Sequence, residues 1–583
     1  MKTTFTPHHA NRAVSALLLT MSLAAVALAI LAGTMSWSAS STRLTHRSIQ
    51  YDRSVAAAEA ATEKVLSRMA RDYLYGGEGL VTANLGSYRV NTVPSASDSA
   101  YWGNWEFNDA TGNTNRTYLQ FEGSSNNVTL NPPYAGLKGN VTTYSVVAHA
   151  RETASVQDVI AGVLQQVQLA SIPIFQFALY SSGDMEISCG QPFKVTGHVH
   201  ANKTLYVEPD ALFLTFVSGV TAVTAILDQR HPLDTRGAPS GGVVYSNLVE
   251  KVSPVDALTL PIGTTNTAEA VREIIEPPPS GGDTNLALAN LRYYNKCDLL
   301  LVVTNTGVYA TSGKFNSFST PVPASELNSF VSTTNSFHDD REHKTVRPID
   351  LNVGNLTAWS QTNNSLRPAL LGSGLLPDVT CVYVVDARTL PGSDLGAVRV
   401  VNGRQLPASG LTVATGRPLY VLGDYNQMNP ANLGTTNTST TRPASLVADA
   451  ISILSTNWTD ANSTSPLGAR VAGATTVNAA FLTGVVETTL GRYSGGMENF
   501  PRFLEDWGAT HIFTYNGSMI KMFPSLHATN FWTVLVYYNP PARNWAYDLN
   551  FNNPALLPPK SPSVLKVIRS RWATVARGQN VAP

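Results

Sequence analysis

The chain has 583 residues, equal numbers of acidic and basic side chains, and a charged fraction of only 14%. The length fits about two to four domains, and low charge with abundant Gly, Ser, Thr and Asn is typical of a β-rich protein outside the cytoplasm. No block of basic residues is present, so the sequence predicts no nucleic-acid partner.

The N-terminal segment predicts a membrane anchor. Lys2 and Arg12 precede an apolar stretch, Val14 to Met35, which is long enough to span a bilayer because about 20 apolar residues suffice. Positive charge ahead of this stretch predicts a cytoplasmic N-terminus, residues 1–12, with the bulk of the chain outside. We therefore expect residues 13–42 to contact the membrane.

The anchor continues into an amphipathic helix. We expect one helix over residues 13–75, roughly 90 Å long at 1.5 Å per residue. It should end at Gly76-Gly77, because glycine adopts the left-handed conformation that terminates helices. Steps of three and four define the apolar face. Its members are Tyr51, Val55, Ala58, Thr62, Val65, Met69 and Tyr73.

A cleaved secretory signal is the alternative interpretation of the same segment. Ser38-Ala39-Ser40 has the small side chains that signal peptidases prefer. The apolar stretch is longer than the roughly 7–15 residues of a typical signal peptide, which favours a retained anchor.

Five segments resemble one bacterial family. Arg12 to Met21 followed by Ala56 to Glu63 resembles the N-terminus of PilX-type minor pilins of the type IV pilus, in which a hydrophobic helix continues into an alanine-rich helix carrying a β-rich head. Residues 172–178, 197–202 and 499–507 are similar to uncharacterised PilX-like envelope proteins. The resemblance implies an inner-membrane protein with a periplasmic ectodomain, or one assembled at the cell surface, with pilin-like or other envelope proteins as partners.

Beyond the helix the sequence predicts a mainly β fold. Residues 78–180 are expected to form a pilin-like β region. Short, closely spaced strands over residues 181–227 and 376–530 predict two parts of an irregular β-solenoid, similar to a right-handed β-helix, with a β-sandwich as the alternative. Residues 228–375 are expected to be an α+β insertion, and residues 531–583 a tail rich in proline and aromatic residues.

Three local predictions concern the C-terminal third. Asn516-Gly517 is a strong turn dipeptide and predicts a hairpin over residues 512–522. Met497 to Trp507 is amphipathic and predicts a short helix. Pro562 to Val575 predicts a final helix.

Three cysteines lie far apart and lack metal-binding spacing. In an oxidising compartment two of them could pair, and Cys297 and Cys381 are favoured because each lies beside an apolar strand-like run. The alternative is three buried free thiols, Cys189 included.

Two histidines are weak candidates for a metal site. His198 and His200 are two positions apart on a predicted strand, so both side chains point to the same face. Asp184 or Glu186 could supply a third ligand. A polar outer face without metal is the favoured interpretation, so the sequence predicts no metal, cofactor or catalytic residue.

Other polar and aromatic groups are weighed in the same way. The run from His338 to His343 is interpreted as a solvated turn rather than a catalytic cluster. Glycosidases need two carboxylates about 5–9 Å apart, and no spacing singles out a pair among the candidates Asp424, Asp449, Glu487, Glu505 and Asp506. Aromatic residues of the tail could bind glycan or pack onto their own domain. These are Trp532, Tyr537, Tyr538 and Trp545.

The function that these observations favour is structural. The sequence predicts a membrane-anchored, pilin-like envelope protein that acts in pilus or surface-complex assembly or in adhesion. No nucleophile elbow, phosphate-binding loop or Rossmann fingerprint is present, so an enzyme is not favoured. The alternatives are an anchored carbohydrate-active enzyme or a glycan-binding adhesin with a groove on the solenoid.

Overall fold

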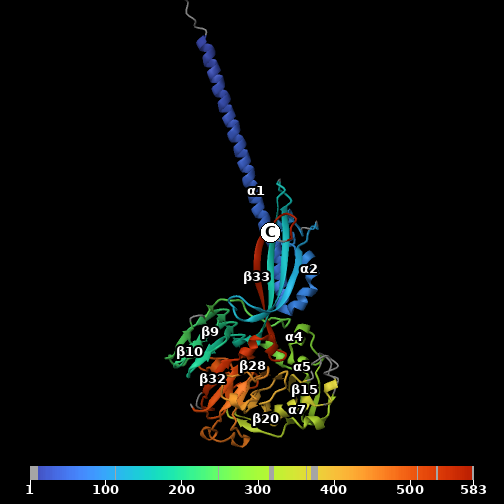
Figure 1. The fold of residues 1–583 in the computed structure, drawn as a ribbon, viewed down its shortest axis with the longest axis vertical. Coiled ribbons are helices and arrows are strands. Elements are labelled where there is room, and N and C mark those ends of the chain that lie inside the picture. Colours follow the sequence, from blue (N-terminus) through green and yellow to red (C-terminus); the bar gives the residue numbers. More distant parts are fainter. Residues whose placement is uncertain are drawn as a thin grey trace, which may run out of the picture.

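The computed structural model of the chain describes residues 11–109, 111, 113–155, 157–246, 249–313, 321–362, 364–368, 378–508, 510–533 and 536–580. The predicted cytoplasmic segment, residues 1–12, falls almost wholly outside them. A long helix leads into an antiparallel sheet, and a large β-rich head lies at the far end of that sheet (Figure 1). The predicted long N-terminal helix followed by a mainly β fold is confirmed.

Helix α1 (Asn11–Ala83) has two parts with different surroundings. Residues 15–49 are exposed throughout, and they contain the one window among the described residues that is long and apolar enough to cross a membrane. From Gln50 onward one face is buried. It contains Ala58, Thr62, Val65, Met69 and Tyr73 as predicted, whereas Tyr51 is 41% exposed.

The helix continues past its predicted end. Gly77 alone leaves the helical conformation, with φ at 71°, and the helix resumes to Ala83. The extra turns form because Val81 is fully buried in the apolar cluster that the helix shares with the sheet. A short helix, α2 (Leu85–Val90), follows and adds Tyr88 to the same cluster.

The sheet that covers α1 is antiparallel and joins distant parts of the chain. Its strands are β1 (Trp105–Asn108), β2 (Tyr118–Thr129), β3 (Lys138–Glu152), β4 (Ile160–Pro173) and β33 (Ser563–Val575). Both β1 and β2 pair with β3, and the order continues through β4 to β33. Val65 and Met69 of α1 pack against Val146, Val167 and Leu565 of the sheet. Helix and sheet therefore share one core.

The predicted C-terminal helix is wrong, because Pro562 to Val575 contains strand β33. β33 pairs with β4 from Ser563↔Pro173 to Val575↔Gly162. Tertiary pairing overrides helix propensity here, since Val564 and Leu565 are buried only when the segment is extended along the sheet. The head is consequently inserted between two neighbouring strands of one sheet (Figure 1).

We expect Leu565→Ala to loosen the packing between helix and sheet. Leu565 is 4% exposed in the cluster with Met69 and Val167, and truncating a buried leucine costs about 2–5 kcal/mol. Limited proteolysis of the full chain should cleave the segment around α2 faster in this variant. Trp572→Ala, on the same strand but 50% exposed, is the matched control, and equal cleavage of both variants would contradict the prediction.

The first part of the head is built from parallel strands that repeat in threes. One sheet of the head runs through both of its parts, and we call it the shared sheet. In the first part its strands are β5 (Phe177–Ser181), β8 (His198–Ala201), β11 (Val220–Ala222) and β14 (Lys251–Val252). A second sheet contains β6 (Met185–Ile187), β9 (Thr204–Val207) and β12 (Ala225–Leu227). A third contains β7 (Phe193–Val195), β10 (Phe213–Phe216) and β13 (Gly242–Tyr245). Each strand pairs in parallel with the strand three further along the chain.

The chain then crosses to the far end of the head through short helices. These are α3 (Ala268–Arg272), α4 (Leu286–Leu291), α5 (Tyr293–Lys296), α6 (Ala324–Leu327) and α7 (Val353–Gln361). β16 (Gly307–Ser312) and β17 (Pro321–Val322) form the antiparallel outer edge beyond β15 (Leu299–Thr304).

The second part of the head returns to the first. It continues the shared sheet with β15 (Leu299–Thr304), β21 (Cys381–Asp386), β23 (Leu411–Thr415), β25 (Ala444–Ala448), β28 (Ala480–Val485) and β31 (Met519–Pro524). β31 pairs in parallel with β5, which joins the two parts edge to edge.

Two further sheets complete this second part. One contains β18 (Val331–Ser332), β19 (Phe337–Asp339), β20 (Lys344–Asn352), β22 (Leu395–Val401), β24 (Leu419–Leu422), β26 (Ile451–Leu454) and β29 (Arg502–Phe503). The other contains β27 (Thr475–Asn478), β30 (Ile512–Gly517) and β32 (Ala542–Tyr547).

The predicted hairpin around Asn516-Gly517 is wrong. β30 and β31 meet at these residues but belong to different sheets, so the chain turns a corner instead of reversing. The predicted helix from Met497 to Trp507 is also wrong. It contains a single 3₁₀ turn, Met497–Asn499, and strand β29, because Phe503 pairs with Ile453 inside the head.

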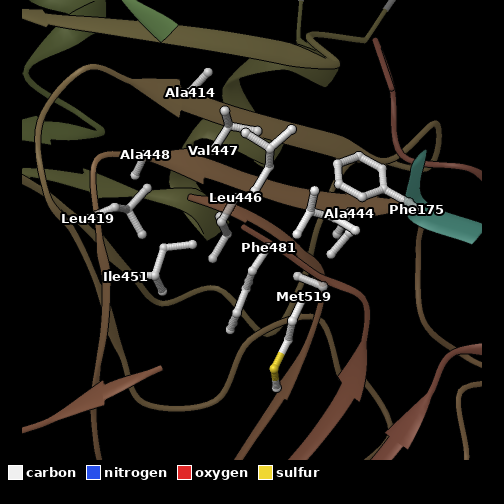
Figure 2. Packing of buried hydrophobic residues seen from close by; sticks show 14 of the residues in the cluster. Phe175, Ala414, Leu419, Ala444, Leu446, Val447, Ala448, Ile451, Phe481 and Met519 are labelled. Atoms are coloured by element: carbon white, nitrogen blue, oxygen red, sulfur yellow. The ribbon is translucent and has the colours of Figure 1, made fainter. Parts of the chain in front are cut away.

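One buried row of apolar residues crosses the shared sheet from β15 to β11. Leu446, Phe481 and Met519 lie side by side on successive strands (Figure 2). Parallel pairing in register extends the row in both directions, through Leu299, Val382, Val413, Leu446, Phe481, Met519, Leu179, Val199 and Val220. Cys189, Cys297 and Cys381 are buried free thiols in the same core, so the alternative to a Cys297–Cys381 disulfide is the one seen.

Candidate functional site

The two histidines singled out by the sequence are bonded to protein groups. His198 Nε2 lies 2.7 Å from the carbonyl oxygen of Ala135. His200 is fully buried, with Nε2 2.9 Å from the amide oxygen of Asn202 and Nδ1 2.8 Å from the hydroxyl of Thr221. Across the described residues, no group of three or more His, Cys, Asp or Glu side chains gathers in a metal-binding arrangement.

The expected third ligands have other partners. Asp184 accepts the backbone N–H of Thr204 at 2.9 Å. Glu186 accepts the hydroxyl of Thr488 at 2.8 Å, and burial raises the pKa of its carboxyl. The histidines and acids therefore contribute to the internal hydrogen bonding of the stacked strands.

His200 should make the stability of the head depend on pH. Burial lowers the pKa of His200 to about 4, below the roughly 6.5 of an unfolded chain. The folded state then binds the proton more weakly than the unfolded chain does. The contribution of neutral His200 to the free energy of unfolding is therefore fully present above pH 6.5 and is lost as the pH falls toward 4. We expect the free energy of unfolding to fall by about 3 kcal/mol over this range because of His200.

The measurement is chemical unfolding of the wild type and of His200→Gln at several pH values. Glu498 and Glu505, whose pKa values burial raises to about 7, respond in the opposite direction but are common to both proteins. Their contributions cancel in the difference between the two proteins. A difference that stays constant from pH 7 to pH 4 would contradict the prediction.

The run from His338 to His343 is not a solvated turn, which corrects the sequence interpretation. Asp339, Arg341 and Glu342 are buried. Glu342 forms an ion pair with Arg502 and accepts the backbone N–H groups of Thr529 at 3.0 Å and Asn530 at 3.3 Å. The run therefore anchors the segment that begins at Thr529, because a buried charge needs partners of this kind.

Asp449 is a buried structural carboxylate. It lies 2.7 Å from the guanidinium of Arg272 and accepts the backbone N–H of Leu526, also at 2.7 Å. The N–H groups of His527 and Ala528 donate to its other oxygen. Burial alone would raise the pKa of Asp449, but the ion pair with Arg272 and these donors outweigh it and hold the pKa below its usual range.

The remaining carboxylates are engaged separately. Asp424 accepts the N–H of Thr476 at 2.9 Å, and burial raises its pKa. Glu505 accepts the N–H and the hydroxyl of Ser455 at 2.6 Å. Asp506 accepts the side-chain amide of Asn539, and Glu487 has a largely exposed side chain near Lys521. Each acid has a structural partner of its own.

The aromatic residues of the tail separate into two pairs. Tyr538 is buried in the core of the head. Trp545 is partly buried and packs against that core. Trp532 and Tyr537 are half-buried and line a surface groove of about 470 Å³. Its other walls include Tyr493, Phe531 and Arg236.

A second hollow of about 300 Å³ adjoins this groove and shares Arg236 and Trp532 with it. Its wall contains polar residues from both parts of the head, among them Asn499, Arg543 and Asp210. We call the two hollows together the Trp532 groove. It lies where chain segments from residues 188–236 and 491–543 meet.

A chain of contacts fixes the groove. Trp532 donates its indole N–H to the hydroxyl of Tyr538 at 2.7 Å, and Tyr538 donates to Asn499 at 2.6 Å. The guanidinium of Arg236 lies 3.7 Å from the ring centroid of Tyr493, whose ring meets that of Trp532 edge-on at 5.6 Å. Sequence reasoning found Trp532 and Tyr537 but missed Arg236 and Tyr493, since nothing local marks them.

Comparison with known proteins gives one distant likeness. No protein-family model and no curated protein matches the chain. Among solved structures it is similar to the competence-associated pilin ComZ from Thermus thermophilus, with 10% sequence identity over 90% of this chain and 98% of that chain. The TM-score of 0.26 is too low to show a shared fold.

Proposed function

We propose that the protein is a membrane-anchored, pilin-like structural component of a bacterial cell envelope. Helix α1 supports this proposal most directly. Its residues 15–49 are exposed and include an apolar window of membrane-spanning length, while its remaining turns are buried against an antiparallel sheet. A helix with this division holds a folded head at a fixed distance from a membrane.

The head is a β-solenoid in this proposal. The parallel pairing of each strand with the next circuit of the chain and the apolar row from Leu299 to Val220 support a solenoid over a sandwich. The positive-inside rule places the N-terminus in the cytoplasm and the head in the periplasm or at the cell surface. There it acts in assembly of a pilus or surface complex, or in adhesion.

An enzyme receives less support than a binding or structural protein. The acids Asp449 and Glu505 are buried, with all their oxygens bonded to structural donors. A glycosidase needs one acid and one base or nucleophile facing the same substrate. Adhesion through a groove requires no such pair, and the Trp532 groove supports that role.

The mass of the mature N-terminus tests the proposal. A start near Ala13 or Val14, with the protein in the filament fraction after shearing of cells, is the result expected of a pilin-like subunit. An intact Met1 with the protein confined to the membrane would replace the pilus role by that of a static anchor. A start near Ser40 with soluble protein would overturn membrane anchoring.

A further inference from the structure

We propose that the Trp532 groove binds an acidic polysaccharide, that is, a chain of sugar rings carrying carboxylates. The inference deepens the adhesive role proposed above, and it rests on that role only for the exposure of the head to such a ligand. The volumes of about 470 and 300 Å³ fall in the range of small-ligand pockets, about 300–1,000 Å³.

The aromatic wall suits the apolar faces of sugar rings. Trp532, Phe531 and Tyr537 are half-buried, so each ring keeps part of its surface open to the groove. Large rigid rings provide contact area at low cost in conformational entropy, because they have only two side-chain torsions. Tyr493 is buried beneath them and supports the ring of Trp532 edge-on.

The charge on the aromatic side of the groove is positive. The exposed Arg492 lies over the ring of Phe531, 5.0 Å from its centroid, and no ion pair joins it to a carboxylate of the described residues. His343 is also exposed and meets Tyr537 edge-on. None of the described residues lining this side is acidic. An unpaired arginine beside stacking rings matches a sugar carboxylate.

The second hollow is lined by polar residues, among them Arg543 and Glu498. Arg543 donates to the backbone oxygen of Glu498 at 2.9 Å, while its Nε has no partner among the described residues. Glu498 is 2% exposed, and one of its oxygens, Oε2, also has no such partner. Buried polar atoms are almost always bonded. Both atoms are themselves shielded from solvent, so these two unmet hydrogen bonds lie inside the wall of the hollow and not on its surface.

The groove is fixed before any ligand binds. The buried carboxylate of Glu342 accepts the N–H groups of Thr529 and Asn530, immediately ahead of Phe531 and Trp532. At Gly495, where φ is 100°, a Cβ would approach Trp532 to 3.1 Å, so only glycine lets this turn lie against the indole. A fixed groove loses little entropy on binding.

A nucleic acid fits the groove less well than an acidic sugar. Single strands bind in grooves whose positive charge follows the backbone over several nucleotides. Arg236 is neutralised here by ion pairs with Asp234 and Asp210, both at 2.8 Å. Among the described residues of the groove, Arg492 on the aromatic side and Arg543 in the second hollow are thus the arginines without an ion pair, which is too few for a continuous positive track, and the net charge of the chain is zero.

Binding of the full-length protein, in detergent micelles, to immobilised polygalacturonate tests the proposal. We expect saturable binding, weakened about tenfold or more by Trp532→Ala and by Arg492→Gln. Trp572→Ala and Arg571→Gln change the same residue types at exposed positions of strand β33, in the sheet that covers α1 and outside the lining of the groove, and should leave binding unchanged. Tyr537→Ala provides a third groove variant if Trp532→Ala fails to fold, as judged by its melting temperature.

Neutral dextran and a thirty-nucleotide oligothymidylate are the comparison probes. Binding of dextran as strong as that of polygalacturonate, and insensitive to Arg492→Gln, would overturn the acidic specificity. Binding of the oligonucleotide in preference to both would assign the groove to nucleic acid. Absence of polygalacturonate binding, or equal losses in groove and control variants, would overturn the site. None of these outcomes depends on membrane anchoring, so failure here is distinguishable from failure of the proposed function.

Discussion

Replacing Asp449 with alanine should lower the free energy of unfolding of the head by about 3–5 kcal/mol. Asp449 is fully buried and paired with Arg272, whose side chain is only 6% exposed. The substitution removes one of the two counter-charges of that buried guanidinium, which keeps only Glu276, at 2.9 Å. It also removes the acceptor of the backbone N–H groups of Leu526, His527 and Ala528, and each unbonded buried donor is costly.

Chemical unfolding of the full chain, followed by tryptophan fluorescence, measures this effect. Asp449→Asn retains one acceptor oxygen but loses the charge, so its loss of stability should fall between that of wild type and that of Asp449→Ala. Glu487→Ala is the matched control, since that side chain is 56% exposed and 3.7 Å from Lys521, and it should change stability by no more than about 0.5 kcal/mol. Equal effects at Asp449 and Glu487 would show that the ion pair contributes nothing.

Local periodicity was sufficient to predict the parts of the fold that depend on neighbours in sequence. The buried face of α1 follows from steps of three and four, and Ala58, Val65 and Met69 occupy it as expected. The prediction failed where a distant strand decides the conformation. β33 is extended because β4, nearly four hundred positions earlier in the chain, offers it an edge to pair with. No window of local sequence contains that information.

The same limit applies to the groove. Its aromatic residues were recognisable because Trp532 and Tyr537 lie in a tail rich in rings. Arg236 comes from the first part of the head and meets Tyr493 only because β31 pairs with β5 and brings the two parts together. His338 to His343 showed the reverse error: charged residues are usually solvated, but Glu342 is buried because Arg502 and two backbone donors satisfy it.

The second large effect should come from charges placed in the exposed half of α1. Leu23 and Ile30 lie in its apolar stretch and are 61% and 62% exposed, so neither contributes to the packing of the folded head. In a bilayer, an arginine near the centre of a helix costs about 2.5–3.5 kcal/mol. The double variant Leu23→Arg, Ile30→Arg should therefore shift the protein from the membrane pellet to the soluble fraction after cell lysis, without changing the melting temperature of the head.

The conservative double variant Leu23→Val, Ile30→Val is the control and should remain in the membrane pellet, because both new residues are apolar. If the arginine variant also stays in the pellet after alkaline washing, the apolar half of α1 is not what holds the protein there. The experiment separates anchoring from folding because residues 15–49 are exposed and no other part of the described chain buries them. An exposed apolar surface of this length is stable only if a membrane or neighbouring helices cover it, and the arginine side chains oppose both.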